Sequence, residues 1–261
     1  MAQPLGRPRV HLRQTASTNA FARELVGRGA PHGTLVSASE QREGRGRQGR
    51  SWAGAPGRSL LCSWVIRDPS PLLSLAAGVA VAETVDASLR ALWGDNHPLV
   101  GLSTHEDQAQ IKWPNDVLVA GRKVAGILVE GRPQQRWAVL GIGINVAVRL
   151  QDLPPELSER AGTLGLGPDD VERVLTRLLT ALDHSLAVSD SEVLDGVRRR
   201  DALLGRTVNW DGGTGTAAGI DESGRLLVDV DADTGSYSGS GSTRVALDSG
   251  EVHLGTNLSR S

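Results

Sequence analysis

Three short apolar runs between residues 117 and 145 constrain the fold more than any other part of this 261-residue chain. They are Val117–Val119, Val124–Glu130 and Trp137–Asn145, separated by Ala120-Gly121 and by Gly131–Arg136. Each run has the length and composition of a strand. Both gaps carry residues that are typical of hairpin turns between antiparallel strands. The sequence therefore predicts an antiparallel meander.

Helices and further strands surround this meander. Strands are predicted at 33–39 and 60–66, the second one fully buried. A short helix is predicted after the N-cap cluster Ser17-Thr18-Asn19, and a longer one over 72–93. Two more helices are predicted, one opened by Asp169-Asp170 and running to 186, and one over 192–204. The first 204 residues thus mix helices with strands.

The helical pattern ends at Gly205. Short strands punctuated by glycine follow at 207–210, 215–220, 226–230, around Tyr237 and at 244–247, and they predict a small β-barrel. We therefore expect two domains, 1–204 and 205–261. The polar segments 94–110 and 151–168 are expected to be mobile insertions, and the Gly/Ser-rich 235–242 a flexible loop of the barrel.

Charge and cysteine content exclude several classes of protein. The chain has 28 Lys+Arg and 30 Asp+Glu, a net charge of −2. This argues against a protein whose main task is to bind the nucleic-acid backbone, because such proteins need an excess of basic residues. The single cysteine, Cys62, excludes an internal disulfide and a cysteine-based zinc site, and the six histidines lack metal-ligand spacing. No apolar stretch approaches the roughly 18 residues that span a bilayer, and no secretory signal is visible. A cytoplasmic protein is expected.

The most unusual segment is residues 44–50, GRGRQGR, in which three arginines alternate with three glycines. Arginine binds phosphate bidentately, and glycine lets backbone N–H groups approach a ligand closely. The segment suits a phosphate or an acyl phosphate. A solvated basic loop or an arginine–glycine nucleic-acid contact is the alternative. The pattern is neither a Walker A motif nor a dinucleotide-binding fingerprint.

Three further motifs carry polar residues next to strands. Lys112-Trp113-Pro114-Asn115-Asp116 groups a cation, an amide and a carboxylate at a strand end, or is an ordinary turn with a surface salt bridge. Lys123 enters a buried strand, where a lysine is normally a snorkelling edge residue. In residues 141–145, GIGIN, the glycines leave room for a flat ligand, and Asn145 could form hydrogen bonds with the edge of a nucleotide base. The alternative is that this run is simply a glycine-rich buried strand.

In combination these motifs resemble the biotin protein ligases. The resemblance runs from about Ser17 to Asn145 through STN, Gln41, GRGRQGR followed by Trp52, KWPND, GRKVAGILVE and GIGIN. It implies an α+β fold, with a mixed, largely antiparallel sheet, flanking helices and a small C-terminal SH3-like β-barrel. No helix-turn-helix precedes Ser17, so the resemblance is to the monofunctional members, without operator DNA binding.

The resemblance implies a two-step reaction. The carboxylate of biotin attacks the α-phosphate of ATP to give biotinoyl-5′-AMP and pyrophosphate. The ε-amine of a lysine on the biotin carboxyl carrier domain of a carboxylase then attacks the anhydride and releases AMP. Such a protein must hold two anions together, exclude water and stabilise developing negative charge. Mg²⁺ is expected with ATP, although the sequence identifies no ligands for it, and a monomer and a homodimer both remain open.

The resemblance also assigns roles by motif. Lys123, Arg47 and Asp116 are the expected catalytic residues, Lys123 as a fixed cation and Asp116 as a candidate to orient or deprotonate the incoming lysine. Residues expected at biotin or its adenylate are Ser17, Thr18, Asn19, Gln41, Arg45, Gly46, Arg47 and Lys123. Residues expected at ATP are Arg45, Arg50, Lys112, Asn115 and Asn145.

Two other functions use the same scaffold or the same loop. Lipoate ligases and octanoyltransferases share the fold, but GRGRxGR and KWPND point away from them. A non-catalytic biotin sensor or nucleic-acid regulator would use the basic loop without chemistry. Pyrophosphate exchange into ATP that depends on biotin, and not on lipoate, separates these alternatives from a biotin ligase.

Overall fold

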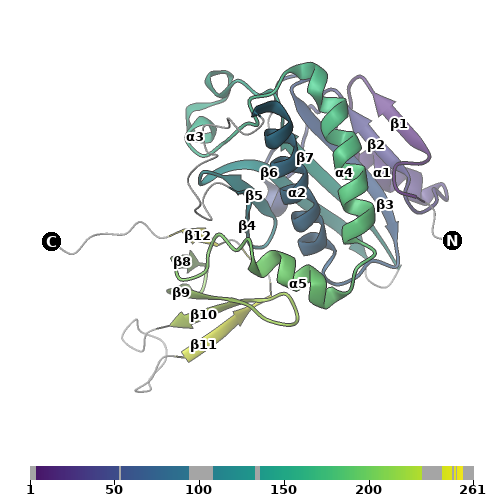
Figure 1. The fold of residues 1–261 in the computed structure, drawn as a ribbon. Coiled ribbons are helices and arrows are strands. Elements are labelled where there is room, and N and C mark those ends of the chain that lie inside the picture. Colours follow the sequence, from purple (N-terminus) through teal and green to yellow (C-terminus); the bar gives the residue numbers. More distant parts are fainter. Residues whose placement is uncertain are drawn as a thin grey trace.

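The computed structural model describes residues 4–52, 54–93, 108–132, 136–230, 243–248, 250 and 252–254. Two sheets organise them (Figure 1). The larger has the strand order β1-β2-β3-β7-β6-β5-β4 and the smaller the order β11-β10-β9-β8-β12. The strands of the larger sheet are β1 (Arg9–Leu12), β2 (Leu35–Ala38), β3 (Ser59–Arg67), β4 (Gln110–Lys112), β5 (Asp116–Val119), β6 (Arg122–Arg132) and β7 (Trp137–Asn145).

The predicted meander is confirmed, since β5, β6 and β7 pair in sequence and antiparallel. Strand β7 also pairs antiparallel with β3 along its whole length, from Asn145 opposite Ser59 to Trp137 opposite Arg67. The edge strand β1, which was not predicted, pairs parallel with β2. The α+β class with a mixed, largely antiparallel sheet is therefore confirmed.

The two faces of this sheet are covered unequally. Helices α2 (Leu73–Trp93) and α4 (Val171–Ser185) lie side by side over one face (Figure 1) and share a core with Leu140, Ile142 and Ile144 of β7. Because side chains alternate along a strand, the intervening residues of β7 point to the other face. There α1 (Thr18–Gly27) packs on Val139 and Val36. The rest of that face is left for the segment around residues 44–52.

Local signals explain where the helices begin and end. The Ser17 side chain accepts a hydrogen bond from the N–H of Ala20, as the predicted N-cap of α1. A short turn, η6 (Pro168–Asp170), precedes α4. Helix α5 (Asp190–Arg198) starts from a capping box at Ser189 and is shorter than predicted. After it the chain pairs with β4 instead, where the N–H of Ile111 donates to the carbonyl of Arg200 at 2.7 Å.

The two predicted insertions have different outcomes. Segment 151–168, expected to be mobile, is hydrogen-bonded to the sheet: the N–H of Gly162 donates to the Lys123 carbonyl at 2.7 Å, and that of Leu164 to the Asn145 carbonyl at 2.9 Å. It begins within the turn η5 (Leu150–Asp152) and includes the short helix α3 (Pro155–Ser158). Leu164 is buried. Most of the second insertion, residues 94–107, lies outside the described residues, as does the predicted barrel loop 235–242.

The smaller sheet contains β8 (Thr207–Trp210), β9 (Gly213–Ile220), β10 (Leu226–Val230), β11 (Thr243–Leu247) and β12 (His253–Leu254). Four of the predicted strands are confirmed, β12 was not predicted, and Tyr237 lies outside the described residues. The buried side chains of the smaller sheet belong to the same hydrophobic core as those of α2 and the larger sheet. The β9–β10 turn contacts the start of α2, and its Gly224 carbonyl accepts from Trp113 Nε1 at 2.9 Å.

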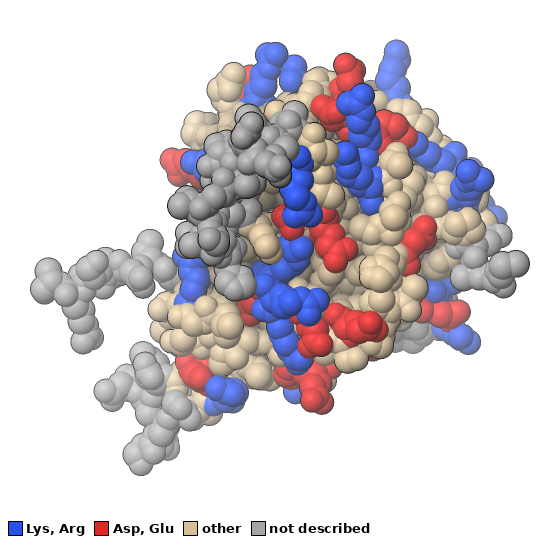
Figure 2. All heavy atoms as spheres, in the orientation of Figure 1, with Lys and Arg blue, Asp and Glu red and all other residues tan. Residues whose placement is uncertain are grey.

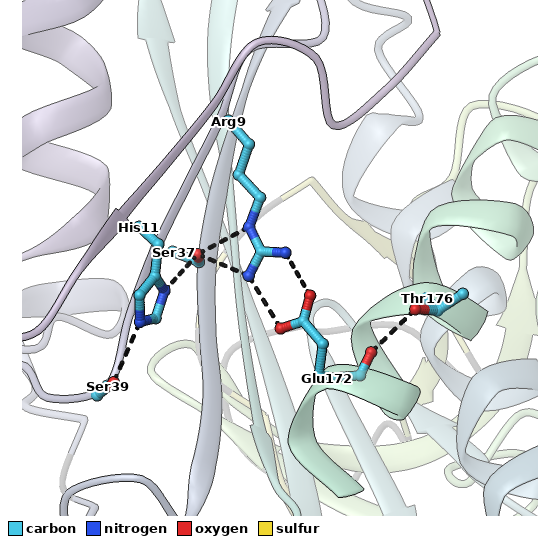
Figure 3. A network of polar contacts seen from close by, with 6 residues as sticks. All are labelled: Arg9, His11, Ser37, Ser39, Glu172 and Thr176. Atoms are coloured by element: carbon cyan, nitrogen blue, oxygen red, sulfur yellow. Dashed lines mark hydrogen bonds and ion pairs between the residues drawn. The ribbon is translucent and has the colours of Figure 1, made fainter. Parts of the chain in front are cut away.

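A polar network fastens the edge strand β1 to α4 (Figure 3). The Arg9 guanidinium donates to both carboxylate oxygens of Glu172, one of them at 3.0 Å, and to Ser37 Oγ at 3.3 Å. His11 Nδ1 lies 2.9 Å from the same hydroxyl. The hydrogen bond from Arg9 lowers the pKa of the Glu172 carboxyl. The network thus ties β1 and β2 to the start of α4 through side-chain contacts.

Charges of both signs are interspersed over the face shown in Figure 2. This face carries no large area of one sign, as expected for a chain of net charge −2. Among the described helices, none is long and apolar enough to span a membrane.

Candidate active site

Glycines form the floor of the candidate site on the open face of the sheet. A Cβ at Gly143 would lie 2.6 Å from the Trp52 ring, and one at Gly126 would lie 2.8 Å from it. A Cβ at Gly141 would overlap the Asn19 side-chain oxygen. Within GIGIN, Gly143 does leave room for a flat group, but in the structure that group is the indole of Trp52, a residue of the same chain, while Gly141 leaves room for the Asn19 side chain.

The basic segment 44–50 forms a closed hairpin-like loop over this floor. Arg45 and Ser51 pair in an antiparallel bridge, and the N–H of Gly46 donates to the Arg50 carbonyl at 2.7 Å. The tip is the turn η1 (Arg47–Gly49), where Gly49 has φ +75°, a conformation that glycine adopts without strain. The loop and two residues of β6, Leu128 and Glu130, line a pocket of about 580 Å³.

Polar side chains expected at biotin gather at one end of this floor. Gln41 Oε1 accepts from both the N–H and the hydroxyl of Thr18, at 2.7 and 3.0 Å. Asn19 Nδ2 donates to Glu130 Oε2 at 2.7 Å, and Arg23 donates to the other oxygen of Glu130 at 3.0 Å. Thr18 and Asn19 are buried. The structure thus brings Thr18, Asn19 and Gln41 together, while the Ser17 hydroxyl caps α1.

Cations gather at the other end. Lys123 Nζ lies 2.6 Å from Asp116 Oδ1 and 5.6 Å from the centroid of the Trp52 ring. Lys112 lies directly opposite Asp116 in the pairing of β4 with β5. Burial is the main cause of a lowered pKa at Lys112, opposed by Asp116 and reinforced by the positive charges of Lys123, Arg50 and Arg160. The arrangement is a cationic site with one carboxylate at its centre.

Arg47 and Asn115 connect the loop to this cationic end. Arg47 donates to Asn115 Oδ1 at 3.4 Å, and Asn115 Nδ2 donates to the Ile127 carbonyl at 2.9 Å. Burial lowers the pKa of Arg47, and the charge of Asp116 opposes that effect. An arginine that is partly desolvated while still charged favours an anionic ligand, because a phosphate would restore its lost solvation.

Asn145 lies at the end of β7, next to the floor. Its Nδ2 donates to the Gly162 carbonyl at 2.9 Å, and its buried Oδ1 has no partner among the described residues. The free oxygen therefore suits a ligand that donates an N–H, as an adenine amino group does. Arg45, which forms the bridge with Ser51, and Arg50, which precedes Ser51, are both exposed.

Several residues of the site were assigned no role from the sequence. Trp52 was noted only as part of a motif, and Ser63, Glu130 and Arg23 were not singled out. Ser63 had a usable signal, because it is a polar residue in the otherwise apolar run 60–66, LLCSWVI. Glu130 and Arg23 had no such signal in the sequence, because their ion pair forms only where α1 and β6 come together in the fold.

The described residues of the candidate site offer no cluster of protein ligands for Mg²⁺. Among the described residues, no three His, Cys, Asp or Glu side chains are grouped so that they could hold a metal ion. Asp116 is engaged with Lys123.

Comparisons with known proteins identify the family of this chain. Residues 11–146 match the family model described as the biotin/lipoate A/B protein ligase family, and residues 203–255 match the biotin protein ligase C-terminal domain. The biotin–[acetyl-CoA-carboxylase] ligase of Mycobacterium tuberculosis is 34% identical over 83% of this chain and 81% of its own length. That of Paracoccus denitrificans is 34% identical over 83% and 92%.

Longer relatives and solved structures complete the comparison. The bifunctional ligase/repressor of Bacillus spizizenii is 38% identical over 57% of this chain, but this chain spans only 43% of that protein. The structure of the Aquifex aeolicus biotin protein ligase in complex with biotin and ATP superposes with a TM-score of 0.70 at 26% identity, over 95% of this chain and 98% of that one. The chain therefore belongs to the biotin/lipoate A/B protein ligase family and, within it, to the biotin protein ligases.

Proposed function

We propose that this protein attaches biotin to a specific lysine of a biotin carboxyl carrier domain, at the expense of ATP and through biotinoyl-5′-AMP. The observation that carries the proposal is the arrangement of the open sheet face. Its polar end, with Thr18 and Gln41, is suited to a neutral hydrogen-bonding head group. Its cationic end, with Lys112, Lys123 and Arg47, is suited to a carboxylate meeting a phosphate. The glycine floor under Trp52 joins the two ends.

In the first step the two reacting anions must be held together. Lys123 and Arg47 offset the repulsion between the biotin carboxylate and the α-phosphate, and they stabilise negative charge as it moves to the phosphate oxygens. Lys123 is paired with Asp116 and lies over an indole, so it acts as a positioned cation. The loop 44–50, expected at the adenylate through Arg45, Gly46 and Arg50, excludes water from the anhydride.

In the second step an amine attacks the biotinyl carbonyl and AMP leaves. Asp116 is the carboxylate that we assign to orient that amine or to accept its proton. The support is its position, within 2.6 Å of Lys123 Nζ and opposite Lys112 in the sheet. Lys112, Asn115 and Asn145 are assigned to the nucleotide. Ser17, Thr18, Asn19 and Gln41 are assigned to the head group of biotin.

We expect Mg²⁺ to arrive with ATP, held mainly by the phosphates, since it keeps several waters and few protein ligands in such sites. The protein partner is a carboxylase carrier domain, and a monomer and a homodimer both remain compatible with the site. DNA binding forms no part of the proposal. A cytoplasmic location is proposed because the reaction consumes ATP.

The test uses both half-reactions. We expect exchange of labelled pyrophosphate into ATP to require biotin and not to occur with lipoate or octanoate. We also expect a purified carrier domain to gain one biotinyl group by mass when ATP, biotin and the protein are present. Exchange supported by lipoate would favour the lipoate-ligase alternative, and biotin binding without exchange would favour a non-catalytic biotin sensor.

A further inference from the structure

Glu130 of β6 has no role in the reaction as described so far, yet it lies in the candidate site. Among the described residues that line the pocket of about 580 Å³, Glu130 is the only acidic one, and the basic residues are Arg45 and Arg47 of the loop. A carboxylate repels the biotin carboxylate and the phosphates that the proposed reaction brings together. Its presence in the pocket therefore points to a role other than anion binding.

The carboxylate of Glu130 is held in place by α1. Asn19 Nδ2 donates to its Oε2 at 2.7 Å, and Arg23 donates to its Oε1 at 3.0 Å. Asn19 and Arg23 are four residues apart and so share one face of the helix. The other side of the Asn19 amide is fixed as well, since its Oδ1 lies 2.6 Å from Ser63 Oγ of β3. With both oxygens engaged and the side chain only 23% exposed, the carboxylate has a defined position relative to the pocket.

The ion pair of Glu130 with Arg23 turns its negative end toward the pocket. Glu130 lines the pocket, whereas Arg23 is not among the described residues that line it. Asn19, which holds the carboxylate, follows Thr18 in α1, and Thr18 is hydrogen-bonded to Gln41 at the polar end of the site. The pocket thus has a negative charge beside the polar end of the site and positive charges on the basic loop.

We propose that Glu130 is a specificity-determining residue that selects ligands with a neutral polar head group and rejects those whose head group carries a negative charge. This inference rests on the proposed function and deepens it, since it names the charge class of the substrate: a monocarboxylate whose far end is uncharged. The two signs of charge align such a ligand, with its carboxylate toward the arginines and its head group toward Glu130. A dianion would place one negative end against Glu130, and that like-charge contact opposes its binding.

The test compares nonanedioate with its monoamide, two ligands of the same length that differ only in the charge of one end. Each is measured without ATP, at neutral pH and one salt concentration, as a competitor of labelled biotin. The measured quantity is the preference for the monoamide, which is the dissociation constant of nonanedioate divided by that of the monoamide. We expect the wild type to prefer the monoamide by roughly tenfold or more, because like charges in contact at a partly buried site cost at least that factor.

Two substitutions at the same ion pair should change this preference in opposite directions. Glu130→Gln keeps the shape of the side chain and removes its charge, so the preference should fall by roughly tenfold. Arg23→Gln leaves the charge of Glu130 without its counter-ion, so the preference should rise. A role confined to holding α1 against the sheet predicts a change in the same direction for both variants, because both substitutions break the same contact.

The matched control is the ion pair between Arg9 of β1 and Glu172 of α4, neither of which lines the pocket. Glu172→Gln and Arg9→Gln should leave the preference unchanged. If the wild type binds no biotin, the proposed function fails and this inference fails with it. If the wild type binds biotin and Glu130→Gln keeps the wild-type preference, only the inference is overturned. Should Glu130→Gln not fold, Arg23→Gln decides: a higher preference supports the inference, and an equal or lower one overturns it.

Discussion

At the scale of single residues, Lys123 shows most clearly what tertiary structure adds. In the sequence, its position at the start of a buried strand favoured an edge lysine with its charge in water, and only the family resemblance made it a cation of the site. Its ammonium group is 2.6 Å from Asp116 and faces the Trp52 ring, with the side chain 36% exposed. That placement favours the site, and its function can be tested directly.

Replacing Lys123 with glutamine keeps most of the side-chain length but removes the charge. We expect single-turnover formation of biotinoyl-AMP, at saturating biotin and ATP, to slow by roughly 10²-fold or more, the scale for one lost electrostatic stabiliser. The thermal midpoint should change little, because a partly exposed ion pair contributes modestly to stability. Lys123→Arg should recover the rate only in part, since a planar guanidinium does not replace a compact ammonium. A glutamine variant within about twofold of the wild type would return Lys123 to the role of an edge residue.

Lys112 should make nucleotide binding sensitive to alkaline pH. Burial holds its pKa below the usual 10.5, so its charge is lost at a lower pH than that of an exposed lysine. Because the charged form binds phosphate, the Kd for ATP should rise with increasing pH, beginning below the pH at which an exposed lysine loses its charge. In Lys112→Arg the charge persists and the rise should move to higher pH. Superimposable profiles for wild type and variant, measured by equilibrium binding, would show that Lys112 does not contact the phosphates.

A residue of the candidate site could be predicted from the sequence only where the signal for it lies within a short motif. Gln41, Lys112, Asp116 and Lys123 were found because each lies within a short motif whose chemistry is visible in sequence. Glu130 and Arg23 were not found, since they are 107 positions apart and meet only through the sheet. Trp52 belonged to a motif, but its position over Gly126 and Gly143 depends on three separate segments.

At the scale of elements, the meander and the main helices were predicted because their signals are local. Each depends on an apolar period and on turn or cap residues within the same window. The edge strand β1 was missed because it has four residues and its partner, β2, lies 26 positions further on. The last predicted helix was too long because residues after Arg198 pair with Ile111, a tertiary interaction that overrides helix propensity.

The loop 44–52 is the element whose behaviour should change most on ligand binding. Arg45, Gln48, Gly49 and Arg50 are exposed, and three arginines of like charge lie within six residues. An anion bound within the loop would reduce their mutual repulsion. We expect trypsin to cleave between Arg45 and Arg50 in the free protein and to cleave far more slowly with biotin plus ATP. ATP with lipoate serves as the control, and equal cleavage in all conditions would contradict a closing loop.

At the scale of the whole molecule, the second sheet is joined to the first through one core. The two-domain division at residue 205 remains a prediction, but the structure shows how much the two parts share. The β9–β10 turn rests on Leu72 and Leu75 of the α2 region, and Trp113, within KWPND, donates to the carbonyl of that turn. Burying the two leucines contributes about 1.5–3 kcal/mol each, against a total stability of about 5–15 kcal/mol. The sheets should therefore unfold together.

A glycine at this junction provides the test. Gly224 has φ +79°, and a Cβ there would lie 2.6 Å from Leu72 Cδ2 and 2.9 Å from Leu75 Cδ1. Gly121, in the β5–β6 turn, has a similar φ of +73° with nothing within 4 Å, so Gly121→Ala reports backbone strain alone. Gly224→Ala should be more destabilising than that control by roughly 1–3 kcal/mol, because the added methyl overpacks the junction. Calorimetry should show one unfolding transition at a lower temperature. Two transitions, of which only one shifts, would mean that the smaller sheet unfolds on its own. The contact of the smaller sheet with Trp113 would then be dispensable for the stability of the larger sheet.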